Sequence, residues 1–172
     1  MKRILPVPDL LRDSIYDIKP EDLLRRGVRF VLLDIDNTIA PYTVHEATAE
    51  MRAWVAGLQG AGLDLYILSN NRGDRPERFA AAFGLPYRKR ARKPFQRTLR
   101  SVLTETGYKA EESCLIGDQI YTDTACAKWC GALAVTVKPI RFTNPWLLLR
   151  YWLEAPFRLR GRGEEKKAAK YR

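Results

Sequence analysis

The stretch that decides the fold is Val28-Arg29-Phe30-Val31-Leu32-Leu33-Asp34-Ile35-Asp36-Asn37-Thr38. Its first six residues form a short run rich in β-branched and aromatic side chains, which predicts a buried strand over residues 28–33. Polar residues follow directly, beginning with Asp34. A strand that ends in this way is typical of an open parallel sheet that binds its ligand at the carboxyl ends of the strands.

Further apolar runs alternate with helical patterns along the chain. Pro at helix starts, Gly at helix ends and the spacing of apolar side chains predict helices over residues 46–60, 74–83, 94–106 and 122–130. Strands are expected at residues 63–68, 85–87, 113–116 and 133–137. The predicted fold class is therefore α/β, a doubly wound, Rossmann-like parallel sheet of about five strands with helices on both faces.

The length of 172 residues suits one domain, which we divide into three parts. Residues 1–27 are expected to form a helical lead-in, and residues 28–140 the α/β core. Residues 141–172 are expected to form a basic, aromatic helix followed by a mobile charged tail.

Thirty Lys and Arg against twenty Asp and Glu give a formal net charge of +10. The excess lies in two segments: residues 72–100 carry 10 basic and 2 acidic residues, and residues 138–172 carry 10 basic and 3 acidic residues. This basicity indicates an anionic partner, which is a phosphorylated substrate, an anionic membrane or nucleic acid.

Cysteine and histidine are scarce. The three cysteines argue against a disulfide framework, and Cys126 and Cys130 are expected in the core rather than on zinc. The single histidine, His45, is expected at the surface. No apolar stretch reaches the ~18 to 20 residues that cross a bilayer. We therefore expect a cytoplasmic protein, with peripheral attachment to the inner face of the membrane as a second expectation.

Polar residues follow several of the predicted strands. The carboxyl ends of parallel strands meet at one edge of the sheet, so these side chains should converge. Converging carboxylates repel each other unless a cation lies among them, and oxygen ligands without His or Cys favour Mg²⁺. The candidate metal ligands are Asp34, Asp36, Asp118 and Asp123, and the candidate substrate-phosphate ligands are Asn37, Thr38 and Asn70.

Two carboxylates separated by one residue suit phosphoryl transfer. Asp34, ionised beside a divalent cation, can attack phosphorus and form an aspartyl-phosphate. Asp36 can protonate the leaving oxygen and then activate water. Ser69 and Lys93 complete the predicted catalytic set as a clamp on the phosphate oxygens, and Lys93 stands at the start of a predicted helix.

Four segments resemble the motifs of the haloacid dehalogenase (HAD) superfamily phosphatases. They are Asp34-Ile-Asp-Asn-Thr38, Ser69-Asn70, Lys93-Pro94 and Gly117-Asp118-Gln-Ile-Tyr-Thr-Asp123, and the match covers residues 28–137. The resemblance implies a HAD-like fold, Asp34 as nucleophile, Asp36 as acid and base, and Ser69 and Lys93 on the phosphoryl group. It also implies Mg²⁺ held by Asp34, the backbone carbonyl of Asp36 and Asp118, with Asp123 in support.

Within the superfamily the sequence resembles subfamily IIIA phosphatases of the YqeG type. The likeness includes SIYDIKPEDLLRRGVRFVLLDIDNTIAPY, residues 14–42, and the GDQxxTD form of the fourth motif. That group is similar to the mitochondrial and plastid phosphatidylglycerophosphate phosphatases. The segment TACAKWCGA, residues 124–132, lacks the Gly-Asn expected there in many relatives, a departure that concerns packing more than chemistry.

The motif spacing leaves no room for a cap domain, because the intervals from Asp36 to Asn70 and from Asn71 to Pro94 hold only the helix that each needs. An uncapped site is open, so we expect a large substrate. The best candidate is phosphatidylglycerophosphate, hydrolysed to phosphatidylglycerol at the membrane surface. The alternatives are a phosphatase of protein or nucleic-acid ends and a catalytically quiet ribosome- or GTPase-associated binding factor.

Two basic segments indicate which kind of partner the protein binds. The run from Arg88 to Lys93 could guide a polyanionic surface to the site, or could simply be a solvated helix entry. Residues 145–162 combine Trp, Leu and Phe with arginines, which suits the interface of an anionic membrane. Their apolar side could also pack on the sheet with the arginines outward. Nucleic acid is the less favoured partner.

Overall fold

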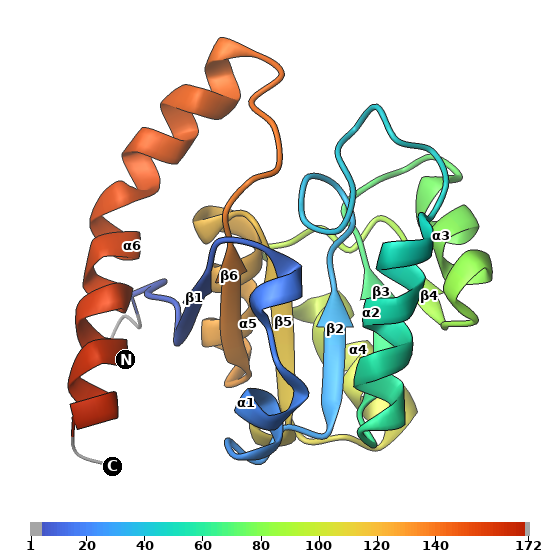
Figure 1. The fold of residues 1–172 in the computed structure, drawn as a ribbon, viewed down its shortest axis with the longest axis horizontal. Helices are drawn as coiled ribbons and strands as arrows, with labels where there is room; N and C mark the ends of the chain where they lie inside the picture. Colours follow the sequence, from blue (N-terminus) through green and yellow to red (C-terminus); the bar gives the residue numbers. More distant parts are fainter. Residues whose placement is uncertain (1–4, 171–172) are drawn as a thin grey trace.

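The computed structural model describes residues 5–170 of the chain, and within them six strands form one parallel sheet (Figure 1). The sheet order is β1-β6-β5-β2-β3-β4. The strands are β1 (Leu10–Arg12), β2 (Phe30–Leu33), β3 (Asp64–Leu68), β4 (Tyr87–Arg88), β5 (Ser113–Gly117) and β6 (Leu133–Val137). The predicted α/β fold with a doubly wound parallel sheet is confirmed.

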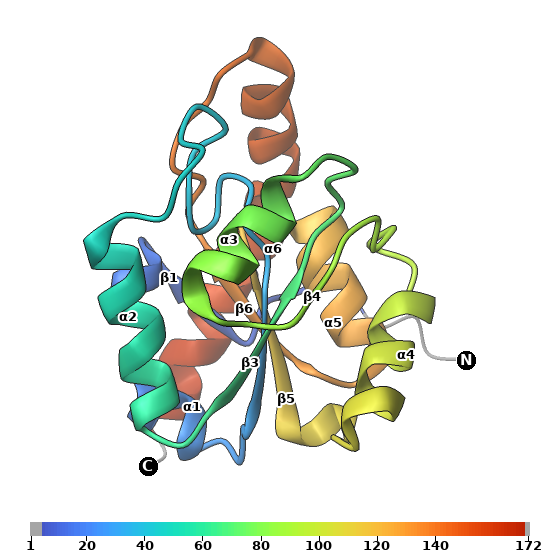
Figure 2. The same cartoon turned by 90° about the vertical axis from the view of Figure 1, so that its right-hand side faces the viewer.

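Helices cover both faces of this sheet. One face is covered by α1 (Pro20–Leu24), α2 (Ala49–Gly60) and α3 (Arg75–Phe83), the other by α4 (Arg97–Thr106) and α5 (Ala125–Cys130) (Figure 2). Short helical turns are η1 (Ile15–Asp17), η2 (Ala110–Glu112) and the π-helical η3 (Ile120–Thr124). The C-terminal helix α6 (Pro145–Lys170) lies beside the edge strand β1 (Figure 1).

Alternate side chains of β2 enter two separate cores. Val31 and Leu33 join the core under α2 and α3, while Phe30 and Leu32 join the core under α4 and α5. Successive side chains of a strand point to opposite faces of the sheet. Both faces of β2 are therefore buried, which explains the unbroken apolar run that predicts this strand.

Between the strands the described chain has no cap domain, as predicted. A loop joins β2 to α2, and β3 leads through α3 alone to β4. The carboxyl ends of the strands therefore face an open surface.

The N-terminal segment is more than the predicted helical lead-in, because it supplies β1 as a sixth strand. Asp9 begins the pairing with Ala134: its backbone N–H donates to the Ala134 carbonyl over 2.9 Å, and its carboxylate accepts from the Ala134 N–H over 2.8 Å. Three residues, Leu10–Arg12, are too few for a recognisable alternation. Residues 1–4 and 171–172 of the predicted lead-in and tail lie outside the described residues.

Helix α6 covers the edge of the sheet through Glu165. Its carboxylate accepts a hydrogen bond from the backbone N–H of Leu11 over 3.2 Å and pairs with Arg12 over 2.7 Å. An open strand edge is a template for unwanted pairing, so this contact closes a vulnerable surface. The predicted mobile tail is instead a continuation of the helix, which runs to Lys170.

The inward face of α6 carries charge, and large apolar side chains point away from the body. Glu154 and Arg158 are buried, whereas Trp146 and Trp152 are 69% and 68% exposed. The expectation of an apolar inward side with outward arginines is therefore wrong for Arg158, whose charge is satisfied inside the protein by Glu154. Within residues 5–170, no helix combines the length and apolar character needed to cross a membrane.

The docking of α6 can be tested at Gly161. A Cβ there would lie 2.8 Å from Pro8 Cγ and 2.9 Å from the Pro8 carbonyl oxygen. We expect Gly161→Ala to lower the free energy of unfolding by about 1–3 kcal/mol, because overpacking forces the helix away. Urea unfolding followed by circular dichroism measures the change.

Gly163 is the matched control, because a Cβ there meets nothing within 4 Å. Gly163→Ala should stabilise the helix by about 0.5–1 kcal/mol. Equal effects of the two substitutions would contradict the close contact of α6 with Pro8.

Candidate active site

The predicted site residues follow strands that are fixed by the sheet ladder. The backbone N–H of Asp34 donates to Ile116 over 2.9 Å and extends the pairing of β2 with β5. The N–H of Ser69 donates to Arg88 over 3.0 Å and extends the pairing of β3 with β4. The backbone thus brings the ends of four strands to one edge.

Three carboxylates and one ammonium form the centre of this edge. Asp34, Asp118 and Asp123 are buried, and one oxygen of each lies within 4.8 Å of the others. Lys93 Nζ lies 2.7 Å from Asp34 Oδ1 and 2.6 Å from Asp123 Oδ1. Thr38 Oγ1 donates toward Asp34 Oδ2, at 3.3 Å, or Asp118 Oδ1, at 3.4 Å.

The negative charge of this cluster is only partly balanced by Lys93. Burial raises the pKa of Asp34 to about 7, and Lys93 offsets that rise only in part. Burial, and then the charges of Asp123 and Asp34, raises the pKa of Asp118. Burial lowers the pKa of Lys93, but the neighbouring carboxylates outweigh it and raise that pKa overall, so Lys93 stays charged.

The donor set fits a divalent cation. When ionised, the three carboxylates and the Lys93 ammonium together carry a charge of −2; Arg150, whose Nη2 lies 3.9 Å from Asp118 Oδ2, offsets it in part, and a divalent cation would neutralise the rest. Asp118 Oδ2 is buried without a hydrogen-bond partner, although it is the kind of oxygen that hard cations take as a ligand. Asp34, Asp118 and Asp123 could therefore hold the metal, and their role as ligands stays a prediction, as does that of Asp36.

Gly117 makes the cluster sterically possible. A Cβ at this position would lie 2.3 Å from Asp123 Cγ, so any larger residue would push the carboxylate away. Asp123 is also fixed by its Oδ2, which accepts the backbone N–H of Gln119 over 3.2 Å. The loop between β5 and α5 is thus folded back onto itself, and this brings Asp118 and Asp123 together.

Asp36 lies outside the carboxylate cluster. Its Oδ1 accepts from Arg75 Nε over 2.7 Å, and its Oδ2 accepts from Asn71 Nδ2 over 2.8 Å. Arg75 also donates to the carbonyls of Ala40, Pro41 and Val44. The side chain that was predicted as acid and base is therefore held in place by the loop after β3 and by the start of α3.

Asn37 and Asn70 use their side chains as structural ties. The Asn37 amide donates to the Arg141 carbonyl over 2.8 Å and accepts its N–H over 2.9 Å. The Asn70 amide makes the same reciprocal pair with Lys93, at 3.0 and 2.7 Å. These side chains hold the loops that form the site, and their predicted contact with the substrate phosphate stays a prediction.

Ser69 keeps a proton to donate. Its Oγ accepts the backbone N–H of Asn71 over 3.1 Å, an arrangement that uses a lone pair and leaves the hydroxyl hydrogen available. Ser69 is buried at the end of β3, beside the segment that carries Asn70. Its predicted role on a phosphate oxygen is compatible with this geometry.

Helix α6 supplies charged residues to the site that the sequence did not reveal. Arg158 Nη2 donates to the Asp118 carbonyl over 2.5 Å. Glu154 Oε1 accepts the backbone N–H groups of Ile120, at 3.0 Å, and Tyr121, at 3.4 Å. Two residues of a helix far along the chain thus hold the loop that bears Asp118.

Tyr42 and Arg75 were also missed. The pKa of Tyr42 is raised to about 12, first by burial and then by the negative charges of Asp118, Asp36 and Asp34. The phenol therefore remains protonated at neutral pH. Both residues lie in segments whose sequence predicts a polar loop or a charged surface, so the sequence did not indicate that they belong to the site.

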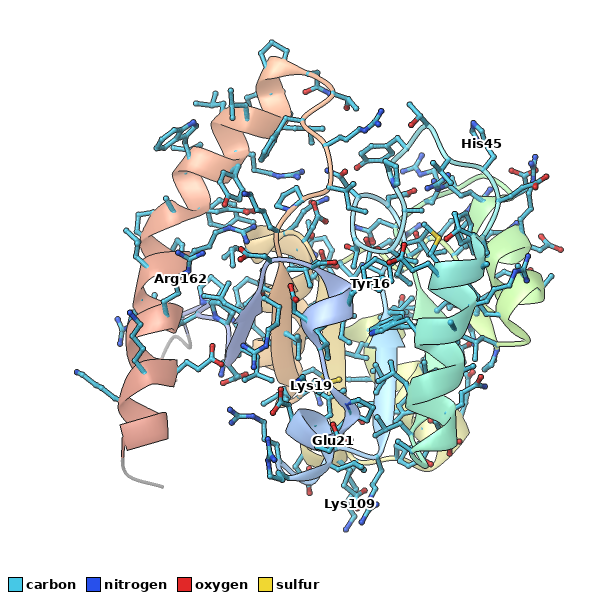
Figure 3. The ribbon with its side chains drawn as sticks, in the orientation of Figure 1. Tyr16, Lys19, Glu21, His45, Lys109 and Arg162 are labelled. Atoms are coloured by element: carbon cyan, nitrogen blue, oxygen red, sulfur yellow. The ribbon has the colours of Figure 1, made fainter. Side chains whose placement is uncertain are left out.

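The structure places His45 at the surface and the three cysteines in the core, where the sequence predicts them. His45 is exposed on the loop after β2, at the same end of the molecule as the site, whereas Lys19, Glu21 and Lys109 lie at the opposite end (Figure 3). Cys114, Cys126 and Cys130 are free and buried. Neither histidine nor cysteine joins the carboxylate cluster of the described residues.

Comparisons with known proteins agree with this fold and site. The family model for HAD-hydrolase-like proteins matches residues 90–147. The chain is 30% identical over 141 residues to the "Probable phosphatase YqeG" of Bacillus subtilis, a match that covers 82% of each protein.

Two solved structures have a similar fold. The cobalt-bound deoxy-D-mannose-octulosonate 8-phosphate phosphatase of Haemophilus influenzae has a TM-score of 0.51 and 18% identity, covering 67% of this chain and 72% of that one. A predicted HAD-like family hydrolase from Porphyromonas gingivalis has a TM-score of 0.51 and 15% identity, covering 72% of this chain and 98% of that one. These two likenesses concern the fold alone.

An uncapped parallel sheet with this edge of carboxylates and a lysine defines a HAD-type hydrolase. On the strength of the bacterial relative, the chain belongs to the YqeG-type phosphatases of the HAD superfamily. Phosphatases of this superfamily use a divalent metal, which agrees with the charge of the cluster.

Metal binding can be measured as stabilisation. At a Mg²⁺ concentration 100 times the Kd, the folded state gains about 2.7 kcal/mol. For a chain of this size we expect the Tm to rise by about 5–10 °C. A chelator should reverse the rise, and differential scanning calorimetry measures it.

Asp118→Asn should abolish the Mg²⁺-dependent rise in Tm, because it removes the negative charge and the carboxylate oxygen, Oδ2, that has no hydrogen-bond partner. Glu111→Gln removes one negative charge from the exposed, opposite end of the molecule and should keep the rise. A Mg²⁺ effect of equal size in both variants would show that the cation binds elsewhere.

Proposed function

We propose that this chain is a Mg²⁺-dependent phosphomonoester hydrolase that works through a phosphorylated Asp34. The observation that carries the proposal is the position of Asp34: it is buried at the end of β2, between Lys93 and the two other carboxylates. A carboxylate held beside a lysine ammonium, next to a site that a divalent cation fits, is the arrangement that nucleophilic attack on phosphorus needs.

In the first step, an Asp34 oxygen forms a bond to phosphorus while the bond from phosphorus to the leaving oxygen breaks. Asp36 acts as the acid and gives a proton to that leaving oxygen. The product alcohol departs, and Asp34 holds the phosphoryl group. Arg75 and Asn71 stabilise the Asp36 carboxylate that this transfer creates.

In the second step, water attacks phosphorus and the bond to Asp34 breaks. Asp36 takes a proton from that water and is ready for another cycle. Inorganic phosphate leaves, and Asp34 returns as a carboxylate beside Lys93. The two steps conserve protons because Asp36 gives one and then takes one.

Positive groups and donors hold the phosphoryl oxygens during both steps. Lys93 already neutralises Asp34 and Asp123, and Ser69 has a hydroxyl hydrogen to donate. A Mg²⁺ ion held by Asp34, Asp118, Asp123 and the backbone carbonyl of Asp36 would supply further positive charge for these oxygens. Thr38 holds the nucleophile against Asp118.

We propose phosphatidylglycerophosphate as the substrate, hydrolysed where the protein lies on the inner face of an anionic membrane. The uncapped site supports a substrate whose bulk stays outside the protein. The exposed face of α6 supports the membrane: Trp146, Leu149, Trp152, Leu153 and Leu159 are each 49% to 69% exposed. Trp and Leu beside basic residues suit the interface of an anionic bilayer.

Phosphate release from phosphatidylglycerophosphate tests this proposal. Protein with Mg²⁺ should release phosphate from that lipid in anionic vesicles, and Asp34→Asn should reduce the rate at least about 1,000-fold, because the nucleophile is lost. Circular dichroism confirms that the variant is folded. A cellular role restored by Asp34→Asn would instead favour the binding-factor alternative.

A surface variant tests the membrane separately. In Trp146→Ala/Trp152→Ala, the ratio of the rate on vesicles to the rate on a soluble aryl phosphate should fall about tenfold, since each lost indole weakens interfacial binding. Trp129→Ala, which changes an exposed tryptophan on α5, is the control and should keep the ratio. Activity on aryl phosphate, phosphopeptide or nucleic-acid ends without activity on the lipid would overturn the lipid substrate.

A further inference from the structure

A cavity of about 470 Å³ opens next to the active site, and it is lined by Asn70 and by three basic side chains, Arg72, Arg90 and Arg92. Arg72 belongs to the loop after β3, and Arg90 and Arg92 to the loop after β4. Both loops lie at the carboxyl end of the sheet, where the carboxylate cluster also lies. The mechanism proposed above uses none of the three arginines.

These arginines keep their charge available. Among the described residues none of the three forms a salt bridge, and all three are exposed. Their neighbours differ, because Arg88 pairs with Glu105 and Lys89 with Glu77. The positive charge of the cavity is therefore not neutralised by the protein itself.

The backbone is strained where it presents two of these arginines. Arg90 and Arg92 adopt φ of 56° and 57°, in the left-handed region that disfavours residues with a Cβ. The N–H of Arg90 donates to Asn71 and that of Ala91 to Ser69, each over 3.0 Å, and these bonds hold the loop in this form. Strain of this kind is kept where the surrounding structure fixes a functional geometry.

Asn70 connects the cavity to the nucleophile. Its side chain lines the cavity and pairs with the backbone of Lys93, whose ammonium contacts Asp34. An anion among the arginines would therefore lie close to a phosphoryl group on Asp34. A guanidinium group can donate two parallel hydrogen bonds to two oxygens of one phosphate. The three arginines therefore favour a phosphate diester or monoester over an uncharged sugar.

We propose that Arg72, Arg90 and Arg92 form a second anion subsite that binds a phosphodiester of the same substrate molecule. The subsite rests on the proposed function, since it takes the group next to the phosphomonoester that Asp34 attacks. A substrate with a monoester and a diester on one short chain occupies both positions. The exposed apolar face of α6 favours a glycerophospholipid headgroup as its source, and a 5′-phosphorylated nucleic acid has the same pair of groups.

Soluble substrates test the subsite without a membrane. We compare glycerophosphoglycerol phosphate, which has a monoester and a diester, with glycerol 3-phosphate, which has the monoester alone. The wild-type kcat/KM should be at least about tenfold higher for the two-phosphate substrate, since charge-assisted hydrogen bonds of this kind change affinity by about 10- to 100-fold. In Arg90→Gln/Arg92→Gln this ratio should fall to near one, mainly through KM.

Arg29→Gln/Arg100→Gln is the matched control, because it removes two exposed arginines that lie outside the cavity. It should keep the substrate ratio. A ratio near one in the wild type, or an equal loss in both double variants, would overturn the subsite while leaving the phosphatase standing. A wild-type preference for a 5′-phosphorylated dinucleotide over the glycerol compound would overturn the lipid source.

Binding of glycerophosphoglycerol, the diester alone, separates the subsite from catalysis. Isothermal titration calorimetry should give a Kd at least about tenfold weaker in Arg90→Gln/Arg92→Gln than in the wild type. If the wild type hydrolyses none of the monoesters, the proposed function fails, and this titration still decides the subsite. Equal binding by the wild type and the variant would contradict it.

Discussion

The position of the Lys93 ammonium between Asp34 and Asp123 is the interaction on which this structure depends. Three carboxylates buried at one edge of a sheet repel each other, and Lys93 removes one unit of that repulsion. The parallel sheet brings the residues together, Gly117 leaves space for Asp123, and Arg158 holds the carbonyl of Asp118. The remaining negative charge of the cluster favours a divalent cation, which would in turn attract the oxygens of a phosphoryl group.

Most of the fold was predictable because its signals are local. A run of apolar residues such as 30–33 is buried on both faces and needs no partner to be recognised. Strand β1 and the orientation of α6 were not predictable, because they depend on contacts with distant residues. Leu10–Arg12 becomes a strand by pairing with β6, and Glu154 and Arg158 turn inward because they satisfy each other and the loop after β5.

The site was predictable to the extent that strand ends in a parallel sheet converge. Asp34, Lys93, Asp118 and Asp123 meet as the sequence indicates. Asn37 and Asn70 hold loops, and this role depends on partners that the sequence does not identify. Arg75, which holds Asp36, lies in a strongly basic segment where each arginine has the same local pattern as its exposed neighbours.

The central claim is that this cluster makes Asp34 a covalent nucleophile, and the mass of the peptide that contains Asp34 tests it most directly. The measurement uses Asp36→Asn, quenched in acid during turnover of an aryl phosphate. An aryl leaving group departs without a proton, whereas hydrolysis of the intermediate needs the base, so the phosphorylated form should accumulate. We predict that this peptide gains the mass of one phosphoryl group. Release of the phenol with Asp34 unmodified would contradict the account.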